Sequence, residues 1–526
     1  MHLNVFLTNE VVLLIMPVLI LVLSLMKLSY ANKLRILLWG QLGNSILSIL
    51  GLLIYFALPA NHNFSLIKNL LDFKIDFVAV CLLMLIAFIT TNVIFFSERY
   101  LCGDSSRLNF IRNLLVLSIF ASLITVSNNL ILSLSSWIAI SLTLWRILRL
   151  KKESKQAAQI VLYHHLFSDL LLLIAIVSII IITNTTTISE LPSQLNLVNN
   201  FMTLFGYKLA IKASSIICLL IILAMSIKSA LFPFHHWLLA TLEAPTPLSG
   251  LLHAGIVNIS AILALQLFPV LATAPNILTL WAGLAYLSAI IGTLIMSTQN
   301  DVKRKLVYST VGQMGFMSLQ CATGFLPSAI FHLIAHGLFK CHMFLQSGNA
   351  VSEGLLQRHW LQAENLPKNV VKTTIGLIAF ILLAIVGIHY FWPVSSSINS
   401  QTTLLMLLAS AAILSTLPAL KKTSISMLFG FNSILLFISS ISVLIACRFD
   451  SLVSFSLQPR EIFMAILLAS FIVMDILLQT IARSNLTKAL YVQVLNGFYI
   501  GHLAQALNNK VKINLTKNNL LGGFND

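Results

Sequence analysis

The sequence has 526 residues, of which 58% are hydrophobic and only 9% are charged, and its mean hydropathy is +0.94. A soluble domain of ordinary composition carries roughly a quarter charged residues, so this composition excludes one. The formal net charge of +16 does not indicate nucleic-acid binding, because the lysines and arginines stand in short loops between apolar runs.

Apolar runs of about 18 to 23 residues recur along the chain, each long enough to cross a bilayer as a helix. We therefore expect an all-α polytopic membrane protein with about 13 to 15 transmembrane helices, 15 in our assignment. The connections are short, so residues 1–483 are expected to form one transmembrane domain, followed by a cytoplasmic or interfacial tail, 484–526. The predicted spans are 10–27, 35–57, 75–97, 110–126, 129–148, 160–183, 213–232, 247–268, 277–296, 305–323, 325–347, 372–392, 402–419, 426–447 and 459–482.

Basic residues alternate between the loops and predict the orientation. Loops with many lysines and arginines alternate with loops that have none, which favours an outside N-terminus and a cytoplasmic C-terminus. Two loops depart from this pattern, one with Lys68 and Lys74 and the other with Arg448 and Arg460. The first residues lack a basic region and a small-residue cleavage site, so the first span is expected to be retained. The basic loops lie near 27–36, 98–112, 146–156, 297–305, 348–372 and 420–424.

Ionisable residues are rare inside the spans. Placing an ammonium group in the bilayer costs about 3 kcal/mol on insertion scales, so such a residue indicates a functional site. Lys228 lies near the end of the seventh span, and Pro233 is expected to break that helix. Broken helices at membrane depth are tolerated where the freed backbone groups line a cavity or find partners. The ionisable residues singled out in the spans are Asp169, Lys228, His253, His332, His336, Lys340 and Asp475.

His332, His336 and Lys340 are spaced i, i+4 and i+8 in the eleventh span. On an α-helix this spacing drifts by only about 40° per step, so the three side chains form one stripe that must face the protein interior or water. Imidazole changes protonation near neutral pH, and a desolvated lysine can release its proton in the same range. With Lys228 and His253 the stripe predicts a proton path; the alternative is that these groups only join helices by hydrogen bonds.

Four further polar positions are weaker candidates. His235 and His236 follow the Pro233 break, where they are expected either to pass protons or to be a solvated interfacial pair. Glu243 is either a charge near a helix start or a partner of Lys228, because it lies between Lys228 and His253 in sequence. Asp475 is expected to contact a neighbouring helix or subunit.

Motifs for direct energy use or metal binding are not found. There is no G-x-x-x-x-G-K-[ST] loop for ATP, and the six cysteines are scattered singly without a C-x-x-C pair. We therefore expect no metal site, no cofactor and no catalytic site in this chain, and an energy supply from an ion gradient or a partner.

Three segments resemble the antiporter-like subunits of respiratory NADH dehydrogenase (complex I) and of multisubunit Na⁺/H⁺ antiporters. They are Lys228-Ser-Ala…Pro233…Pro245-Thr-Pro-Leu-Ser…His253-Ala, Asp301-Val-Lys-Arg…Tyr308-Ser-Thr…Gly315 and His332…His336-Gly-Leu-Phe-Lys340. The resemblance covers about residues 75–350. It implies the antiporter-like fold, with Lys228, His253, His332, His336 and Lys340 as the proton or cation path.

The sequence also departs from that family. The family glutamate of the fifth span, which pairs with the seventh-span lysine, is matched by Ile138. The resemblance therefore leaves Lys228 to pair with Asp169 or Glu243. The later segment with a terminal lysine has no clear match between 372 and 400, and the chain ends before the long lateral helix of the largest complex I subunit.

A narrower branch, the DabB membrane subunits of DAB-type inorganic-carbon transporters, is similar over two segments. These are Glu243-Ala-Pro-Thr-Pro with His253-Ala-Gly-Ile-Val-Asn258, and Leu490-Tyr-Val…Leu495-Asn-Gly-Phe-Tyr-Ile500. The resemblance implies a bacterial inner membrane location and a large peripheral zinc protein, DabA, as the cytoplasmic partner. The zinc then belongs to the partner, and inward flow of protons or Na⁺ drives carbon dioxide hydration.

We therefore carry three hypotheses forward. The first is the energy-coupling subunit of an inorganic-carbon uptake complex. The second is a subunit of a multisubunit cation/proton antiporter or of an NADH-quinone oxidoreductase proton pump. The third is an anchor that transports nothing and holds a soluble enzyme at the membrane, in which Lys228 and Lys340 are replaceable by leucine.

Overall fold

The computed structural model describes residues 2–57, 62–67, 71–151, 153–198, 201–204 and 207–349, together with Gln493, Leu495 and Asn496. The predicted spans from 372 onward, Asp475 and the boundary at 483 lie outside the described residues.

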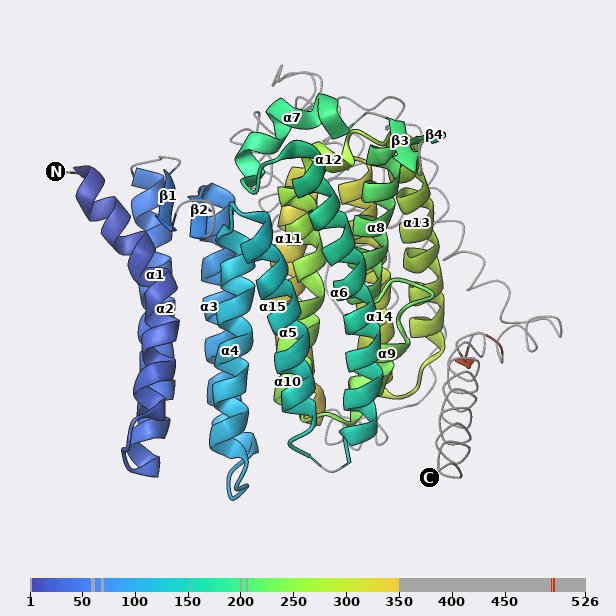
Figure 1. The fold of residues 1–526 in the computed structure, drawn as a ribbon. Coiled ribbons are helices and arrows are strands. Elements are labelled where there is room, and N and C mark those ends of the chain that lie inside the picture. The colour runs from blue at the N-terminus through green and yellow to red at the C-terminus, as the bar shows by residue number, and fades with distance from the viewer. Residues whose placement is uncertain are drawn as a thin grey trace, which may run out of the picture.

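The described chain forms a bundle of long helices that run between two opposite ends (Figure 1). Eight of the helices within these ranges are long and apolar enough to cross a membrane, which confirms the predicted class of polytopic membrane protein. The helices of the bundle are α1 (His2–Leu25), α2 (Tyr30–Ala57), α3 (Phe77–Tyr100), α4 (Arg107–Val126), α5 (Leu130–Leu148), α6 (Lys155–Thr183), α8 (Ala213–Lys228), α10 (Thr246–Ala254), α11 (Ile259–Gln266), α13 (Pro275–Thr298), α14 (Val302–Ala322) and α15 (Leu326–Gln346).

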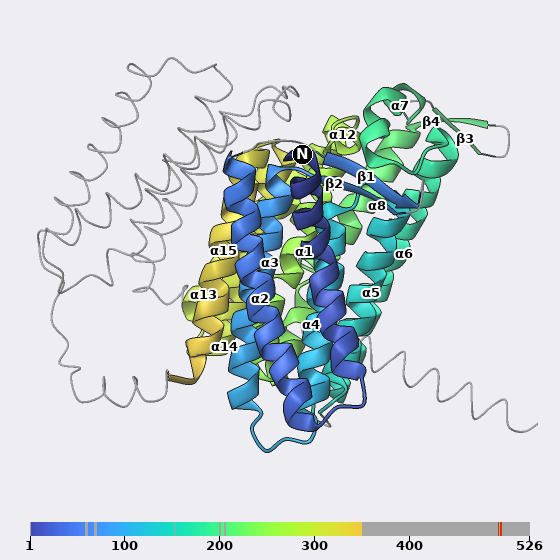
Figure 2. The ribbon, with the colours of Figure 1, turned by 90° about the vertical axis from the view of Figure 1, so that its left-hand side faces the viewer.

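The helix boundaries follow from polar caps at the ends of apolar runs. Asp76, Asn129 and Asp301 each accept a hydrogen bond from a backbone N–H in the first turn of the helix that follows, α3, α5 and α14 respectively. Asp301, the first residue of the Asp301-Val-Lys-Arg segment, thus starts α14. The α1–α2 pair packs along α3 and α4 at one side of the bundle (Figure 2).

The outer surface of α6 shows how the bundle meets lipid. Apolar side chains that recur at helical spacing are exposed there, and the opposite face carries buried Asp169 and His165. A helix with an exposed apolar face and a buried polar face belongs in a bilayer with its polar face toward the protein. The exposed side chains of α6 are Tyr163, Leu166, Phe167, Leu170, Leu173, Ile174, Val177 and Ile181.

One end of the bundle holds structure that the prediction of an all-α protein missed. Two antiparallel hairpins, β1 (His62–Ile67) with β2 (Leu71–Ile75) and β3 (Phe201–Leu204) with β4 (Tyr207–Lys212), form in the connections. The short helices α7 (Leu191–Val198) and α12 (Phe268–Leu271) lie at the same end (Figure 1).

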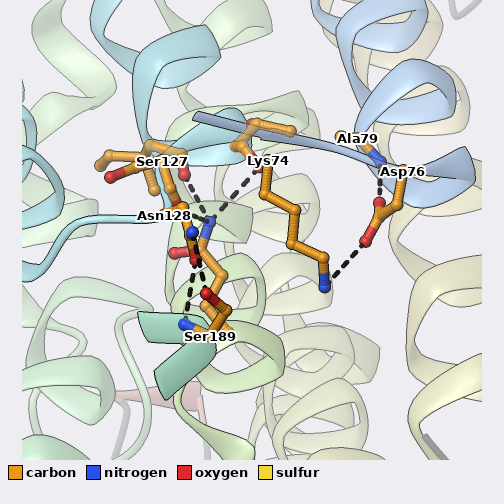
Figure 3. Close-up of polar contacts among 9 residues, drawn as sticks. Lys74, Asp76, Ala79, Ser127, Asn128 and Ser189 are labelled. Carbon is orange, nitrogen blue, oxygen red and sulfur yellow. Dashed lines mark hydrogen bonds and ion pairs between the residues drawn. The ribbon is translucent and has the colours of Figure 1, made fainter. Parts of the chain in front are cut away.

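Polar side chains join the connections at this end (Figure 3). Asn128 exchanges two hydrogen bonds with Ser189 of the 3₁₀ turn η1 (Ile188–Glu190), and its backbone N–H donates to the Asp72 carbonyl of β2. Lys74, which departs from the charge alternation, forms an ion pair with Asp76 at 3.4 Å. These contacts fix the entry into α3 and α5 and so position the helices that carry the site.

The opposite end gathers the basic loops between α1 and α2, α3 and α4, α5 and α6, and α13 and α14 (Figure 1). Lys151 of one loop pairs with Asp104 of another. Hydrogen bonds from Lys151 and Ser106 lower the pKa of Asp104 to about 2, so this carboxylate stays charged at neutral pH. Basic loops are therefore concentrated at this end, although β4, at the other end, contains Lys208 and Lys212, an exception that the predicted alternation did not include (Figure 1).

Helices α13 and α14 approach closely at two glycines. A Cβ on Gly292 would lie 2.5 Å from the Gly312 nitrogen, and one on Gly315 would lie 2.5 Å from the Ala289 nitrogen. We expect Gly315→Ala to lower the free energy of unfolding by about 1–3 kcal/mol, because backbone atoms cannot yield. Thermal unfolding in detergent measures this. Gly283→Ala on α13 is the matched control, since a Cβ there meets nothing within 4 Å; equal effects of the two changes would contradict the packing argument.

Candidate ion-translocation site

The predicted break after Lys228 is present. Helix α8 ends at Lys228, Ala230 adopts a left-handed φ of 55°, and the chain resumes as α9 (His236–Ala240). The break leaves backbone groups that find partners: Trp237 Nε1 donates to the Ile227 carbonyl, and Ser288 Oγ accepts from the Phe232 N–H. The chain thus interrupts a helix inside the bundle without exposing its backbone to lipid.

Lys228 is completely buried and held by two other helices. Its Nζ donates to the Trp137 carbonyl of α5 at 2.7 Å and to Asp169 Oδ1 of α6 at 3.1 Å. It also lies 4.0 Å from the centroid of the Trp137 ring, in cation–π geometry. The C-terminal end of α8 adds favourable partial negative charge.

Asp169 is the counter-ion of Lys228, and Ser141 Oγ of α5 donates to the same Oδ1 at 3.1 Å. The alternative partner proposed from sequence is wrong: Glu243 is exposed in the 3₁₀ turn η2 (Thr241–Glu243), where Ser154 donates to its backbone carbonyl. Glu243 is near Lys228 in sequence, but α9 carries the chain away to the rim of the bundle. Ile138, which matches the family glutamate, directly follows Trp137, whose carbonyl accepts from Lys228. The carboxylate that pairs with Lys228 therefore comes from α6 and not from α5.

The eighth predicted span contains a second break, which was not predicted. Helix α10 ends at Ala254, the 3₁₀ turn η3 (Ile256–Asn258) follows, and α11 continues. His253 is buried in the last turn of α10 and stacks on Phe344 of α15 at 4.2 Å between ring centroids. The break therefore places a histidine where a helix terminates inside the bundle.

His253 and Lys340 are joined through α14. His253 Nδ1 lies 3.1 Å from Thr310 Oγ1, whose hydroxyl donates to the Leu306 carbonyl at 3.0 Å. Lys340 Nζ donates to the same carbonyl at 3.2 Å. Because the one hydroxyl proton is used on Leu306, Thr310 accepts from His253, which places the imidazole proton on Nδ1.

The predicted stripe of His332, His336 and Lys340 is present on α15, and its residues differ in burial. Lys340 and His336 are buried, whereas His332 is partly exposed. His332 lies within hydrogen-bond distance of Gln320 Oε1 and Gln313 Oε1, at 3.0 and 2.8 Å. The rings of His332 and His336 are 6.1 Å apart between centroids, and Lys340 follows one turn further along the same helix face, so the three side chains form a row.

His235 and His236 are not a solvated pair. His235 is 3% exposed, stacks on Phe232 and faces the ring of Tyr308 of α14 at 5.8 Å, while His236 is partly buried. They stand at the start of α9, which lies nearer to the end of the basic loops than most of α8 does (Figure 1).

The sequence analysis missed His165, which is fully buried one helical turn before Asp169. The signal was present, since His164 and His165 fall inside the sixth predicted span. Thr310, Gln313 and Gln320 were also missed, because neutral polar residues are common in membrane helices.

Chemically, the arrangement is two groups of protonatable side chains inside one helical bundle. A buried lysine with a carboxylate lies at one break, and a second lysine connects to a histidine at the other break. Intramembrane ionisable groups of this kind mark candidate proton or ion pathways, and the two groups together are the candidate site of this chain.

The family match and the fold together define the class of protein as an antiporter-like membrane subunit. The Mrp complex from Dietzia sp. DQ12-45-1b superposes with a TM-score of 0.62, covering 97% of this chain and 60% of that chain at 18% identity. The sequence profile of the family described as NADH:quinone oxidoreductase/Mrp antiporter, TM matches residues 127–417, more than half of the chain. The chain belongs to this family.

Two curated relatives carry a more specific name. The probable inorganic carbon transporter subunit DabB2 of Halothiobacillus neapolitanus is 32% identical over 301 residues, 57% of this chain and 53% of that protein. The probable inorganic carbon transporter subunit DabB of Bacillus subtilis is 50% identical over 135 residues, 25% of this chain and 26% of that protein. The chain spans about half, or less, of the length of the curated relatives it matches.

Proposed function

We propose that this chain is the energy-coupling membrane subunit of an inorganic-carbon uptake complex. Protons, or Na⁺, flow inward through Lys228, His253 and the row His332, His336 and Lys340. This flow drives a large zinc protein resembling carbonic anhydrase, which is bound on the cytoplasmic side of the bacterial inner membrane. The chain itself contributes no catalytic group and no cofactor.

The observation that carries this proposal is the buried Lys228–Asp169 pair at the break of α8. The Lys228 ammonium group is 0% exposed, and its removal from water costs several kcal/mol that its contacts must offset. A protein that only anchors a partner has no need of such a group. The similarity to subunits named for inorganic-carbon transport supports the cargo. The basic loops gathered at the end of the described bundle opposite the start of α1 support an outside N-terminus (Figure 1).

A growth test separates this function from its alternatives. The full chain is co-expressed with the proposed zinc partner in a bacterium that lacks carbonic anhydrase and cannot grow in ordinary air. We expect growth only when both proteins are present, and none with either protein alone or with Lys228→Met at an unchanged membrane level. Failure of the intact, associated pair to restore growth would overturn inorganic-carbon uptake.

The second candidate is a subunit of a cation/proton antiporter or of an NADH-quinone oxidoreductase pump, which the family match favours. It predicts salt sensitivity or loss of NADH-dependent proton pumping when the gene is deleted. Either phenotype, with no effect on growth in air, would select it.

A further inference from the structure

His165 is a buried histidine that no contact in the described structure explains. Its side chain is 0% exposed, and neither ring nitrogen has a hydrogen-bond partner among the described residues. A buried polar group without a partner costs stability, and the great majority of such groups are bonded. An unbonded imidazole at this position therefore needs a reason.

Its position connects two parts of the site. His165 precedes Asp169 by one turn of α6, so both side chains lie on the same helix face. The Oδ2 atom of Asp169 also lacks a hydrogen-bond partner within the described ranges, and His165 is within electrostatic range of Lys228.

On its other side His165 meets α9. Its ring contacts the ring of Trp237 edge to face, with centroids 4.5 Å apart and an interplanar angle of 82°. Trp237 directly follows His236, and neither ring nitrogen of His236 is bonded among the described residues. His236 is only partly buried, and α9 lies toward the end of the basic loops (Figure 1). His165 thus stands between the Lys228–Asp169 pair and the start of α9, which carries His236.

We propose that His165 is a proton-relay residue that connects the Lys228–Asp169 pair to the histidines of α9 and so to the cytoplasmic side. The inference rests on the proposed function. Neutral His165 takes a proton from the Lys228 ammonium group on one ring nitrogen, which leaves a neutral amine and an imidazolium. It then releases the proton on its other nitrogen toward His236, and the amine is recharged from the opposite side. This moves one proton and leaves His165 in its other tautomer, so the ring must turn over before the next transfer; each completed cycle then returns both groups to their starting state.

Packing alone does not require a histidine here. An edge-to-face contact with Trp237 would be made equally well by phenylalanine, which would also remove two unbonded buried nitrogens. The relay therefore predicts that the imidazole serves transport rather than stability.

The test uses chemical rescue of the full chain with its partner in membrane vesicles. Proton flux under an imposed membrane potential is followed with a pH-sensitive dye. We expect His165→Ala to lower the flux by about 100-fold, the scale of a lost proton-transfer group. Added imidazole should restore it, whereas pyrazole, of the same size and shape but much less basic, should not. Ser168→Ala is the matched control on α6: Ser168 is equally buried, donates only to the Ala224 carbonyl, and its replacement should leave flux unchanged.

The outcomes separate the relay from the function on which it rests. Wild-type flux in His165→Ala, with Lys228→Met inactive, overturns the relay and leaves the function standing. Restoration by both azoles, or by neither, assigns His165 a packing role and also overturns the relay. Wild-type flux in Lys228→Met overturns the proposed function itself.

Discussion

Lys228→Met is expected to abolish ion-driven activity and to lower the free energy of unfolding by about 3–5 kcal/mol. The substitution leaves the Asp169 carboxylate buried without its cation, and breaking a buried ion pair from one side carries a cost of this size. It also removes the donor to the Trp137 carbonyl. Denaturant unfolding in detergent measures stability, and growth in air measures activity.

The double variant Lys228→Met/Asp169→Leu distinguishes lost function from lost folding. When both charges are replaced by apolar groups of similar volume, no uncompensated charge remains, and most of the lost stability should return. Activity should not return, because the lysine and the carboxylate that hold and release the proton at the break are both gone. A double variant that is stable and restores growth would show that the pair is structural.

Lys340→Met is expected to remove activity. Its free energy of unfolding should stay unchanged or rise by about 2–3 kcal/mol, whereas that of Lys228→Met should fall. Lys340 is completely buried and donates to the Leu306 carbonyl. Among the described residues, no carboxylate forms an ion pair with it. Replacing such a charge with an apolar side chain removes a desolvation cost, and Thr310 continues to satisfy the carbonyl.

The same unfolding and growth measurements check this prediction. Leu333→Met, a buried apolar change on the same helix, is the control and should alter stability by less than about 1.5 kcal/mol with activity retained. If Lys340→Met destabilises the protein as strongly as Lys228→Met, a carboxylate partner for Lys340 exists. If Lys340→Met supports growth, the α15 row is not the ion path.

Much of the helical architecture was predictable, because each span carries its signal locally. Runs of apolar residues bounded by Asp76, Asn129 and Asp301 begin and end within a few residues of the observed α3, α5 and α14. The hairpin β1–β2 was missed, although buried Phe73 and Ile75 alternate with exposed Lys74, a weak strand pattern in a short segment. The second break, after His253, was missed because no proline marks it.

The sequence by itself determined that this is a helical membrane protein with two intramembrane lysines, and that His332, His336 and Lys340 share a face. These properties depend on composition and on the fixed period of the helix. Only the tertiary structure decided that Asp169 and not Glu243 neutralises Lys228, that Thr310 links His253 to Lys340, and that His165 contacts Trp237 of α9. Each of these is a contact between residues far apart in sequence, and which helix faces meet depends on how the whole bundle packs.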